Sequence, residues 1–240
     1  MAFISRIGFF FDYLEIEVLT FQIKKYIRFQ TNCLFMKNPF LMLSLAFAVL
    51  VWSLINPFEY FTAFLEVLPG VLGIIILMAT FKKFRFSDFT YFLIMLHCII
   101  LFVGGHYTYA EVPLFDWLKD VMGSERNNYD KLGHFAQGLV PAMIIREIFL
   151  RKEVVARKSY LNLIIVLMCL GISAAYELIE WFVSILTGDG GDAFLGTQGD
   201  VWDTQSDMMF AGIGALLGLF LLSKTQNKSI SKLPETPDTL

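Results

Sequence analysis

The sequence predicts an all-α, polytopic membrane helix bundle with six transmembrane helices and cytoplasmic N- and C-termini, preceded by an amphipathic N-terminal helix. The first observation behind this prediction is a mean hydropathy of +0.61. Of the 240 residues, 56% are hydrophobic and 17% are charged, which leaves too few polar side chains to cover a soluble domain of this size. The second observation is that the apolar residues form long runs separated by short charged segments.

Residues 1–36 form the predicted amphipathic N-terminal segment. Apolar residues recur at helical spacing at Phe3, Ile7, Phe10 and Leu14, with charged residues among them, which is typical of a helix lying in the membrane interface. We expect a six-helix transmembrane domain over residues 37–223. Residues 224–240 are rich in Lys, Ser, Thr and Pro and are predicted to be a disordered cytoplasmic tail.

Six apolar runs approach the roughly 17–25 residues that cross a bilayer. They cover residues 40–55, 61–81, 89–104, 133–150, 161–186 and 208–223. The first run is short and ends at Asn56 and Pro57, which favour a helix stop. The fourth contains His134, Gln137 and Pro141, so its hydropathy is ambiguous, and the distribution of charge identifies it as a crossing.

Basic residues are distributed unevenly between the two sides of the predicted bundle. All but three of the 19 Lys and Arg lie in or next to the N-terminal segment, the second and fourth loops, and the tail. The exceptions are Lys119, Arg126 and Lys131. The positive-inside rule therefore places both termini in the cytoplasm.

On this topology, ionisable residues from separate spans gather at the outer end of the bundle. Several occur in pairs at helical spacing: Asp130 with His134, Glu177 with Glu180, and Asp203 with Asp207. The full set of candidate residues is Glu66, His106, Tyr109, Glu111, Asp130, Lys131, His134, Glu177, Glu180, Asp203 and Asp207. Ionisable groups at membrane depth are costly unless they are paired, hydrated or functional, so this set predicts a site.

The residue types in this set suit two kinds of chemistry. Imidazole and carboxylate are ligands for divalent cations, and His134, Asp203 and Asp207 are the candidate metal ligands. Neighbouring carboxylates also divide acid and base roles, with Glu177, Glu180 and Asp130 as the candidate catalytic residues. Two further interpretations stay open: passage of a cation or proton, and a structural network in which polar contacts join membrane helices.

Several protein classes are excluded because the sequence lacks their motifs. There is no nucleotide-binding motif and no basic recognition motif, so we expect neither nucleotide nor nucleic acid as a partner. Three histidines are too few for a histidine-box enzyme. Two functional hypotheses therefore remain for a membrane protein. The first is an enzyme or binding protein for an envelope lipid or its head group, with a divalent metal ion as the candidate cofactor. The second is a cation or small-molecule carrier or channel component.

Four stretches resemble the YjdF-type bacterial inner membrane proteins, a family of undefined function. They are Gly-Gly-His-Tyr-Thr-Tyr-Ala-Glu-Val-Pro-Leu at 104–114, Tyr-Asp-x-x-Gly-His-Phe-x-x-Gly at 129–138, Tyr-Glu-x-x-Glu-Trp at 176–181 and Phe-Leu-Gly-Thr-Gln-Gly-Asp-Val-Trp-Asp-Thr-Gln-x-Asp-Met at 194–208. The resemblance implies a multi-pass protein of the bacterial inner membrane, with membrane lipids as its surroundings.

The last three spans are also similar, more loosely, to VanZ-like membrane proteins, which are associated with glycopeptide resistance and the envelope. The shared order is Asp-Lys-x-x-His-Phe, a helix with Glu, and Asp-x-x-x-Asp before a glycine-bearing last helix. This similarity points to the same residues, Asp130, Lys131, His134, Glu177 or Glu180, Asp203 and Asp207.

Overall fold

The computed structural model describes residues 38–187, 194 and 196–234, and these residues form helices and connecting loops without β-strands. The predicted N-terminal helix at residues 1–36 lies outside the described residues. The helices are α2 (Pro39–Ser53), α3 (Tyr60–Thr80), α4 (Asp88–His106), α5 (Pro113–Met122), α6 (Tyr129–Arg151), η2 (Lys158–Tyr160), α7 (Leu161–Thr187), α9 (Asp203–Leu217), η4 (Gly218–Leu222) and α10 (Ser223–Ile230).

Within the described part of the chain, four helical stretches are long and apolar enough to cross a membrane. They are Tyr60–Thr80, Asp88–His106, Lys158–Thr187 and Asp203–Ile230, while α2 is a shorter apolar helix of 15 residues. The prediction of a helical membrane protein is therefore confirmed. The fourth predicted crossing, residues 133–150, corresponds to α6, which has 23 residues but a more polar sequence.

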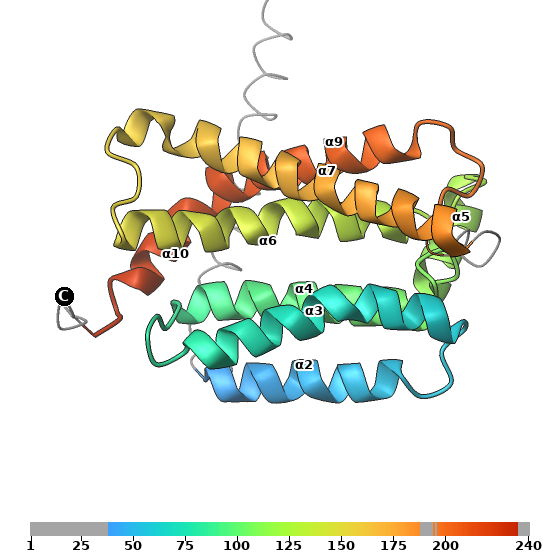
Figure 1. Cartoon of the computed structure of the whole chain (residues 1–240), viewed down its shortest axis with the longest axis horizontal. Coiled ribbons are helices and arrows are strands. Elements are labelled where there is room, and N and C mark those ends of the chain that lie inside the picture. Colours follow the sequence, from blue (N-terminus) through green and yellow to red (C-terminus); the bar gives the residue numbers. More distant parts are fainter. Residues whose placement is uncertain (1–37, 188–193, 195, 235–240) are drawn as a thin grey trace, which may run out of the picture. The chain divides into compact units, whose positions relative to one another are not determined.

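The helices of the transmembrane domain lie side by side, with α2, α3 and α4 adjacent to one another and α6, α7 and α9 forming a second group (Figure 1). Helix α6 is the centre of this arrangement because it contacts α4, α7 and α9, and 12 of its 23 residues are buried. The short helix α5 lies at one end of the bundle and α10 at the other (Figure 1). We refer to these as the α5 end and the α10 end.

Glycines allow α6 and α9 to approach closely. A Cβ atom added to Gly138 on α6 would collide with the backbone of Ala211 on α9, and one added to Gly214 on α9 would collide with the backbone of Phe135 on α6. Small residues permit this kind of close packing between membrane helices. The close approach brings the first turns of α6 and α9, with their charged side chains, together.

A buried polar network joins α4, α6 and α10 at the α10 end. The fully buried carboxylate of Glu147 accepts hydrogen bonds from the Ser87 backbone N–H (2.7 Å) and hydroxyl (2.7 Å), from Thr90 Oγ1 (2.6 Å) and from Arg151 (3.0 Å). Each donor and acceptor thereby gains the partner that a buried polar group requires. Between this network and the α5 end lies an apolar layer containing Leu93, Val140 and Met143.

The tail departs from the prediction at its start. Residues predicted to be disordered from 224 onward begin instead with α10, which continues the last span through the π-helical segment η4. Gln226 is fully buried, accepts a hydrogen bond from Arg146 (2.6 Å) and donates to Thr90 (3.0 Å) and to the Met143 carbonyl (2.7 Å). These tertiary contacts outweigh a composition that by itself favours disorder. Residues 235–240 lie outside the described residues.

Helix α5 in the loop after α4 was not predicted. It begins with Pro113 at its first position, where a backbone N–H would have no partner within the helix, so proline loses nothing by lacking one. It ends at Gly123 in the left-handed conformation (φ +63°). These are ordinary start and stop signals.

Candidate buried acid and histidine site

The candidate site is built from the first turns of α6 and α9 and the last turns of α7, all at the α5 end. Helix α6 contributes Asp130, Lys131 and His134, α7 contributes Glu177 and Glu180, and α9 contributes Asp203 and Asp207. Most of these side chains are buried: Asp207 is 2% exposed, His134 6% and Glu180 7%. Chain reversal between successive antiparallel helices explains how residues about 70 positions apart meet in one layer.

Ion pairs hold α9 to α6. The Lys131 ammonium lies 2.6 Å from Asp203 Oδ1 and 2.7 Å from Asp207 Oδ1. Arg126, in the loop before α6, pairs with Asp203 as well and lies 3.3 Å from Asp130 Oδ2 and 3.7 Å from Asp200 Oδ2. Two basic side chains therefore bridge the carboxylates of two helices and a loop.

The loop before α9 is fixed by the same arginine. Arg126 donates to the backbone carbonyls of Thr197 (2.8 Å) and Gly196 (3.3 Å). The neighbouring Asn127 and Gln198 exchange two further hydrogen bonds, from Asn127 N to Gln198 Oε1 and from Gln198 Nε2 to Asn127 O. These contacts place the loop over the start of α6.

The His134 imidazole has a different role at each ring nitrogen. Nδ1 lies 3.0 Å from Gln137 Oε1, which can only accept, so Nδ1 carries the proton and donates. Nε2 then faces two carboxylates, at 3.4 Å from Asp130 Oδ1 and 3.9 Å from Asp207 Oδ1. Asp130, His134 and Asp207 each offer one ligand atom, and these atoms lie within 4.8 Å of one another. We call these three residues the triad.

A cavity of about 180 Å³ lies beside the triad. Tyr176 donates from its hydroxyl to Glu66 Oε2 at 3.4 Å across this region. The polar side chains that line the cavity are Glu66, His97, Tyr109, Asp130, His134, Gln137, Tyr176 and Glu180. Of the residues predicted from the sequence, Glu66, Tyr109 and Glu180 thus join the site through the cavity rather than through ion pairs.

The wall formed by Tyr109 depends on a strained turn and two glycines. Thr108 and Tyr109 have positive φ angles (52° and 56°), although both are non-glycine residues and both are buried. A Cβ atom at Gly104 would collide with the Tyr109 ring, and one at Gly133 would lie 2.8 Å from it. This explains why the predicted motif at 104–111 contains glycine next to aromatic residues.

The structure separates His106 and Glu111 from the other candidate residues. His106 stacks on the Trp52 ring with a centroid distance of 4.3 Å, and its Nδ1 lies 3.0 Å from the Ser53 carbonyl. Glu111 is exposed in the turn before α5. Among the candidate metal ligands, Asp203 lies between Lys131 and Arg126, and Asp130 stands in the geometric triad in its place.

Three residues that contact the site were not among those predicted. Arg126 lies in a loop without periodicity, so its partners follow from tertiary structure alone. His97 lies in mid-span, where a histidine is commonly a hydrogen-bond partner between helices, yet it lines the cavity, and its Nε2 has no hydrogen-bond partner in the described residues. Tyr176 precedes Glu177, and its position one residue before an acidic pair was the available signal.

The fold and this site define a multi-pass helical membrane protein with a buried acidic cluster at one end of its bundle. A family model described as "Predicted membrane protein (DUF2238)" matches residues 38–228. The chain is similar to inner membrane protein YjdF of Escherichia coli (strain K12), at 45% identity over 176 residues that cover 73% of this chain and 84% of the relative. No solved structure matches the chain.

The chain therefore belongs to the DUF2238 family of predicted membrane proteins. The resemblance to YjdF-type proteins is confirmed, and the protein is a multi-pass protein of the bacterial inner membrane.

Proposed function

We propose that the protein crosses the inner membrane six times with cytoplasmic termini, and that its outward-facing α5 end binds a divalent cation at Asp130, His134 and Asp207. In this proposal the cation helps to hold the head group of an envelope lipid. The observation that carries it is the geometry of the triad, in which an imidazole nitrogen faces two carboxylates.

The topology is supported by the length of α6 and by the distribution of charge. Helix α6 has 23 residues, about 35 Å at 1.5 Å per residue, and its polar residues face neighbouring helices, which is where a membrane span tolerates them. The α10 end carries most of the basic residues of the described chain. Three basic residues lie at the α5 end: Lys119, Arg126 and Lys131. Each of them pairs with an acid, so they are only a small exception to the positive-inside rule.

Cation binding is supported by the excess of negative charge in the site. The carboxylates gathered there are Glu66, Asp130, Glu177, Glu180, Asp203 and Asp207, and the permanent cations that contact them are Arg126 and Lys131. Buried carboxylates without compensation are unfavourable, so they must be protonated or must share a further cation. A divalent ion supplies two charges at once.

The hydrogen bond from His134 to Gln137 supports a metal ligand more than a simple packing contact. Metal-binding histidines commonly donate from the second ring nitrogen to an oxygen, which fixes the orientation of the ring and its tautomer. His134 has this arrangement, with Nε2 facing the two Asp oxygens. A site with imidazole and carboxylate ligands suits Zn²⁺, Mn²⁺ or Fe²⁺ better than Mg²⁺ or Ca²⁺.

Metal content and titration of the purified protein test this proposal. We expect the wild type to bind Mn²⁺ or Zn²⁺ at about one ion per chain, and His134→Ala and Asp207→Asn to bind it at least about tenfold more weakly. His106→Ala is the matched control, because it removes a histidine at the same end that contacts Trp52 instead of the triad. Equal affinity in wild type and His134→Ala contradicts the proposal and favours a structural polar network.

Lys131 gives a second, opposite readout. Its ammonium occupies one oxygen of Asp207 and one of Asp203, so Lys131→Met frees two carboxylate oxygens near the triad. If the site binds a metal ion, this variant should bind it more tightly than the wild type. If the acids instead serve to hold the Lys131 ammonium, Lys131→Met should bind metal no more tightly than the wild type.

A carrier for a cation is the second candidate function. It is favoured by the second buried polar network at the α10 end, around Glu147 and Gln226. In a carrier, this network would be a second binding site for the cation, on the cytoplasmic side. The apolar layer at Leu93, Val140 and Met143 separates the two networks, so a carrier would have to open this layer. Cation uptake into sealed proteoliposomes at the rate of protein-free liposomes would exclude this function.

A further inference from the structure

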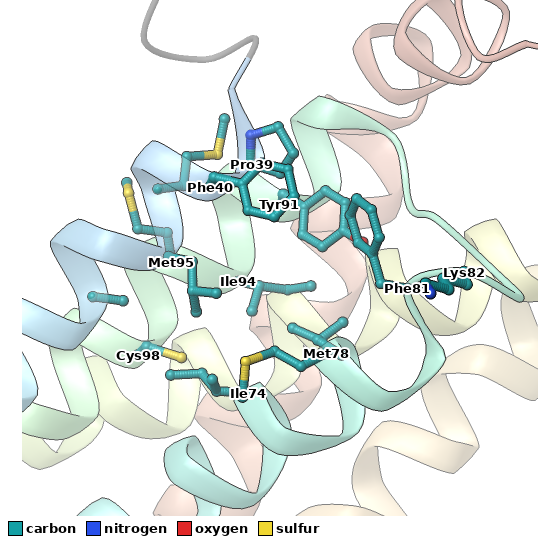
Figure 2. A pocket seen from close by; sticks show the side chains of 14 residues that line it. Pro39, Phe40, Ile74, Met78, Phe81, Lys82, Tyr91, Ile94, Met95 and Cys98 are labelled. Carbon is teal, nitrogen blue, oxygen red and sulfur yellow. The ribbon is translucent and has the colours of Figure 1, made fainter.

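A large apolar groove lies between α2, α3 and α4, away from the triad. Its volume is about 560 Å³, within the roughly 300–1,000 Å³ of typical small-molecule sites. It is lined by the first turns of α2, the last turns of α3 and the first turns of α4, so it lies at the α10 end of the bundle. Figure 2 shows Ile74, Met78, Ile94, Met95 and Cys98 along the groove.

The groove exists because α2 and α3 both pack on α4 while touching each other little. Met42 and Ala46 of α2 and Ile74 of α3 are buried on its walls, and Met78 remains 55% exposed at its side. In a membrane protein this exposed side faces the hydrocarbon of the bilayer. An acyl chain can therefore enter the groove laterally from the bilayer.

A basic side chain stands at one end of this apolar groove. Lys82 is part of its lining and lies beside Phe81 (Figure 2). Lys82 is exposed, so its ammonium is accessible to a ligand. Tyr91 also lines the groove, but its hydroxyl is fully buried and lies near the Phe86 backbone, so it is not available to a ligand.

The surroundings of Lys82 are basic. Lys83 follows it, and Lys152 from the loop between α6 and α7 lies 5.9 Å from the ring centroid of Phe84, two residues after Lys82. The acids near this end include Asp88, which pairs with Arg85, and the buried Glu147. The charge at the groove's polar end is therefore complementary to an anion.

We propose that the groove binds one acyl chain of an anionic phospholipid, with the lipid phosphate at Lys82. The apolar walls alone cannot select a ligand, because a lipid tail is already in an apolar environment in the bilayer. Selection must come from the head group, and basic pockets between membrane helices are known to bind anionic head groups. This inference is independent of the cation proposal, because no residue of the triad takes part.

Native mass spectrometry of the full-length protein, titrated with phosphatidylglycerol or phosphatidylcholine, tests the inference. We expect the wild type to retain phosphatidylglycerol preferentially, and Lys82→Gln to reduce this preference by about fivefold, the effect of one basic residue near an anionic surface. Lys158→Gln is the control for charge, since Lys158 is an exposed lysine at the same end that does not line the groove.

A pair of tryptophan substitutions tests the groove itself. Met78→Trp places a larger side chain over the open side of the groove and should abolish retention of phosphatidylglycerol. Met209→Trp alters a methionine of similar exposure (53% against 55%) on α9 and should leave retention unchanged. Retention of secondary structure by circular dichroism ensures that all four variants are compared as folded proteins.

Three results would overturn the inference. The first is equal retention of the two lipids by the wild type. The second is loss of a protein dimer, with unchanged lipid binding, in Met78→Trp, which would identify a second copy of the chain as the occupant. The third is a cross-link between Cys33 and a Met78→Cys side chain, which would identify the chain's own N-terminal segment.

Discussion

Replacement of Lys131 by methionine should destabilise the protein far more than removal of Lys119, a partly exposed lysine at the same end. Methionine keeps most of the volume and removes the charge. Asp203 retains Arg126 as a partner, but the nearest remaining side-chain nitrogen to Asp207 is then His134 Nε2 at 3.9 Å. Because Asp207 is 2% exposed, its charge is left largely uncompensated. Removal of one partner of a buried ion pair costs about 3–5 kcal/mol.

The assay is reversible unfolding of the purified protein in mixed micelles with chelator present, so that metal binding does not contribute. Lys119→Met is the matched control, because Lys119 and Asp116 form a partly exposed pair at 3.3 Å on α5, and such pairs contribute about 0–1 kcal/mol. The double variant Lys131→Met with Asp207→Asn removes both charges and should recover more than about 1 kcal/mol relative to Lys131→Met alone.

Two results would refute this reasoning. If Lys131→Met is as stable as Lys119→Met, the ion pairs between α6 and α9 do not hold the helices together. If the double variant is no more stable than Lys131→Met, the cost of the single substitution comes from packing and not from an unpaired Asp207.

Further predictions concern packing and polar contacts outside the triad. Gly214→Ala should lower the free energy of unfolding by about 1–3 kcal/mol or more, because the added Cβ meets the backbone of α6. Gly171→Ala has nothing within 4 Å of the added Cβ and should stabilise α7 slightly. Thermal unfolding of both variants measures the difference. Glu147→Ala should lower the free energy of unfolding by about 3–5 kcal/mol, because it removes a buried acceptor shared by Arg151 and three other donors at the α10 end, measured in the same way. Although slight burial opposes it, hydrogen bonding by Thr62 and Phe61 lowers the pKa of Glu59 below 4.5. The stabilising effect of Glu59 is therefore present above that pH and lost as the pH falls through the lowered pKa, so Glu59→Gln should cost about 1 kcal/mol at neutral pH and progressively less as the pH falls through the lowered pKa.

The sequence was sufficient to predict the helices that face lipid. Long apolar runs bounded by charged or turn residues gave α3, α4 and α7 within a few residues of their ends, because the hydrophobic thickness of the bilayer imposes a length that a sequence shows directly. Helix α6 needed the distribution of basic residues as well, since its polar face is hidden among neighbouring helices and lowers its hydropathy. Gly138, which permits that close packing, has no signal in hydropathy at all.

Contacts between distant segments explain what the sequence could not predict. Gln226 lies in a polar stretch that by composition resembles a disordered tail, and it is ordered by Arg146 and by Thr90, residues 80 and 136 positions away. Arg126 meets Asp203 because the loop before α9 folds back on it. In both cases the partner is defined by tertiary structure, which periodicity along one segment does not report.

The sequence predicted Asp203 as a metal ligand, but the triad contains Asp130 in its place. This difference shows how contacts between distant segments affect the candidate site. Helical spacing placed Asp203 and Asp207 on one face of α9 and made them equivalent candidates. Two basic side chains then divide them: Asp203 contacts both Arg126 and Lys131, whereas Asp207 contacts Lys131 and faces His134. A doubly paired carboxylate has little capacity left for a metal ion, and a singly paired one retains it. If a cation binds here, Asp203→Asn should therefore weaken its binding less than Asp207→Asn, while both weaken the contact between α6 and α9. Equal losses of affinity in the two variants would show that the ion pairs rearrange on binding.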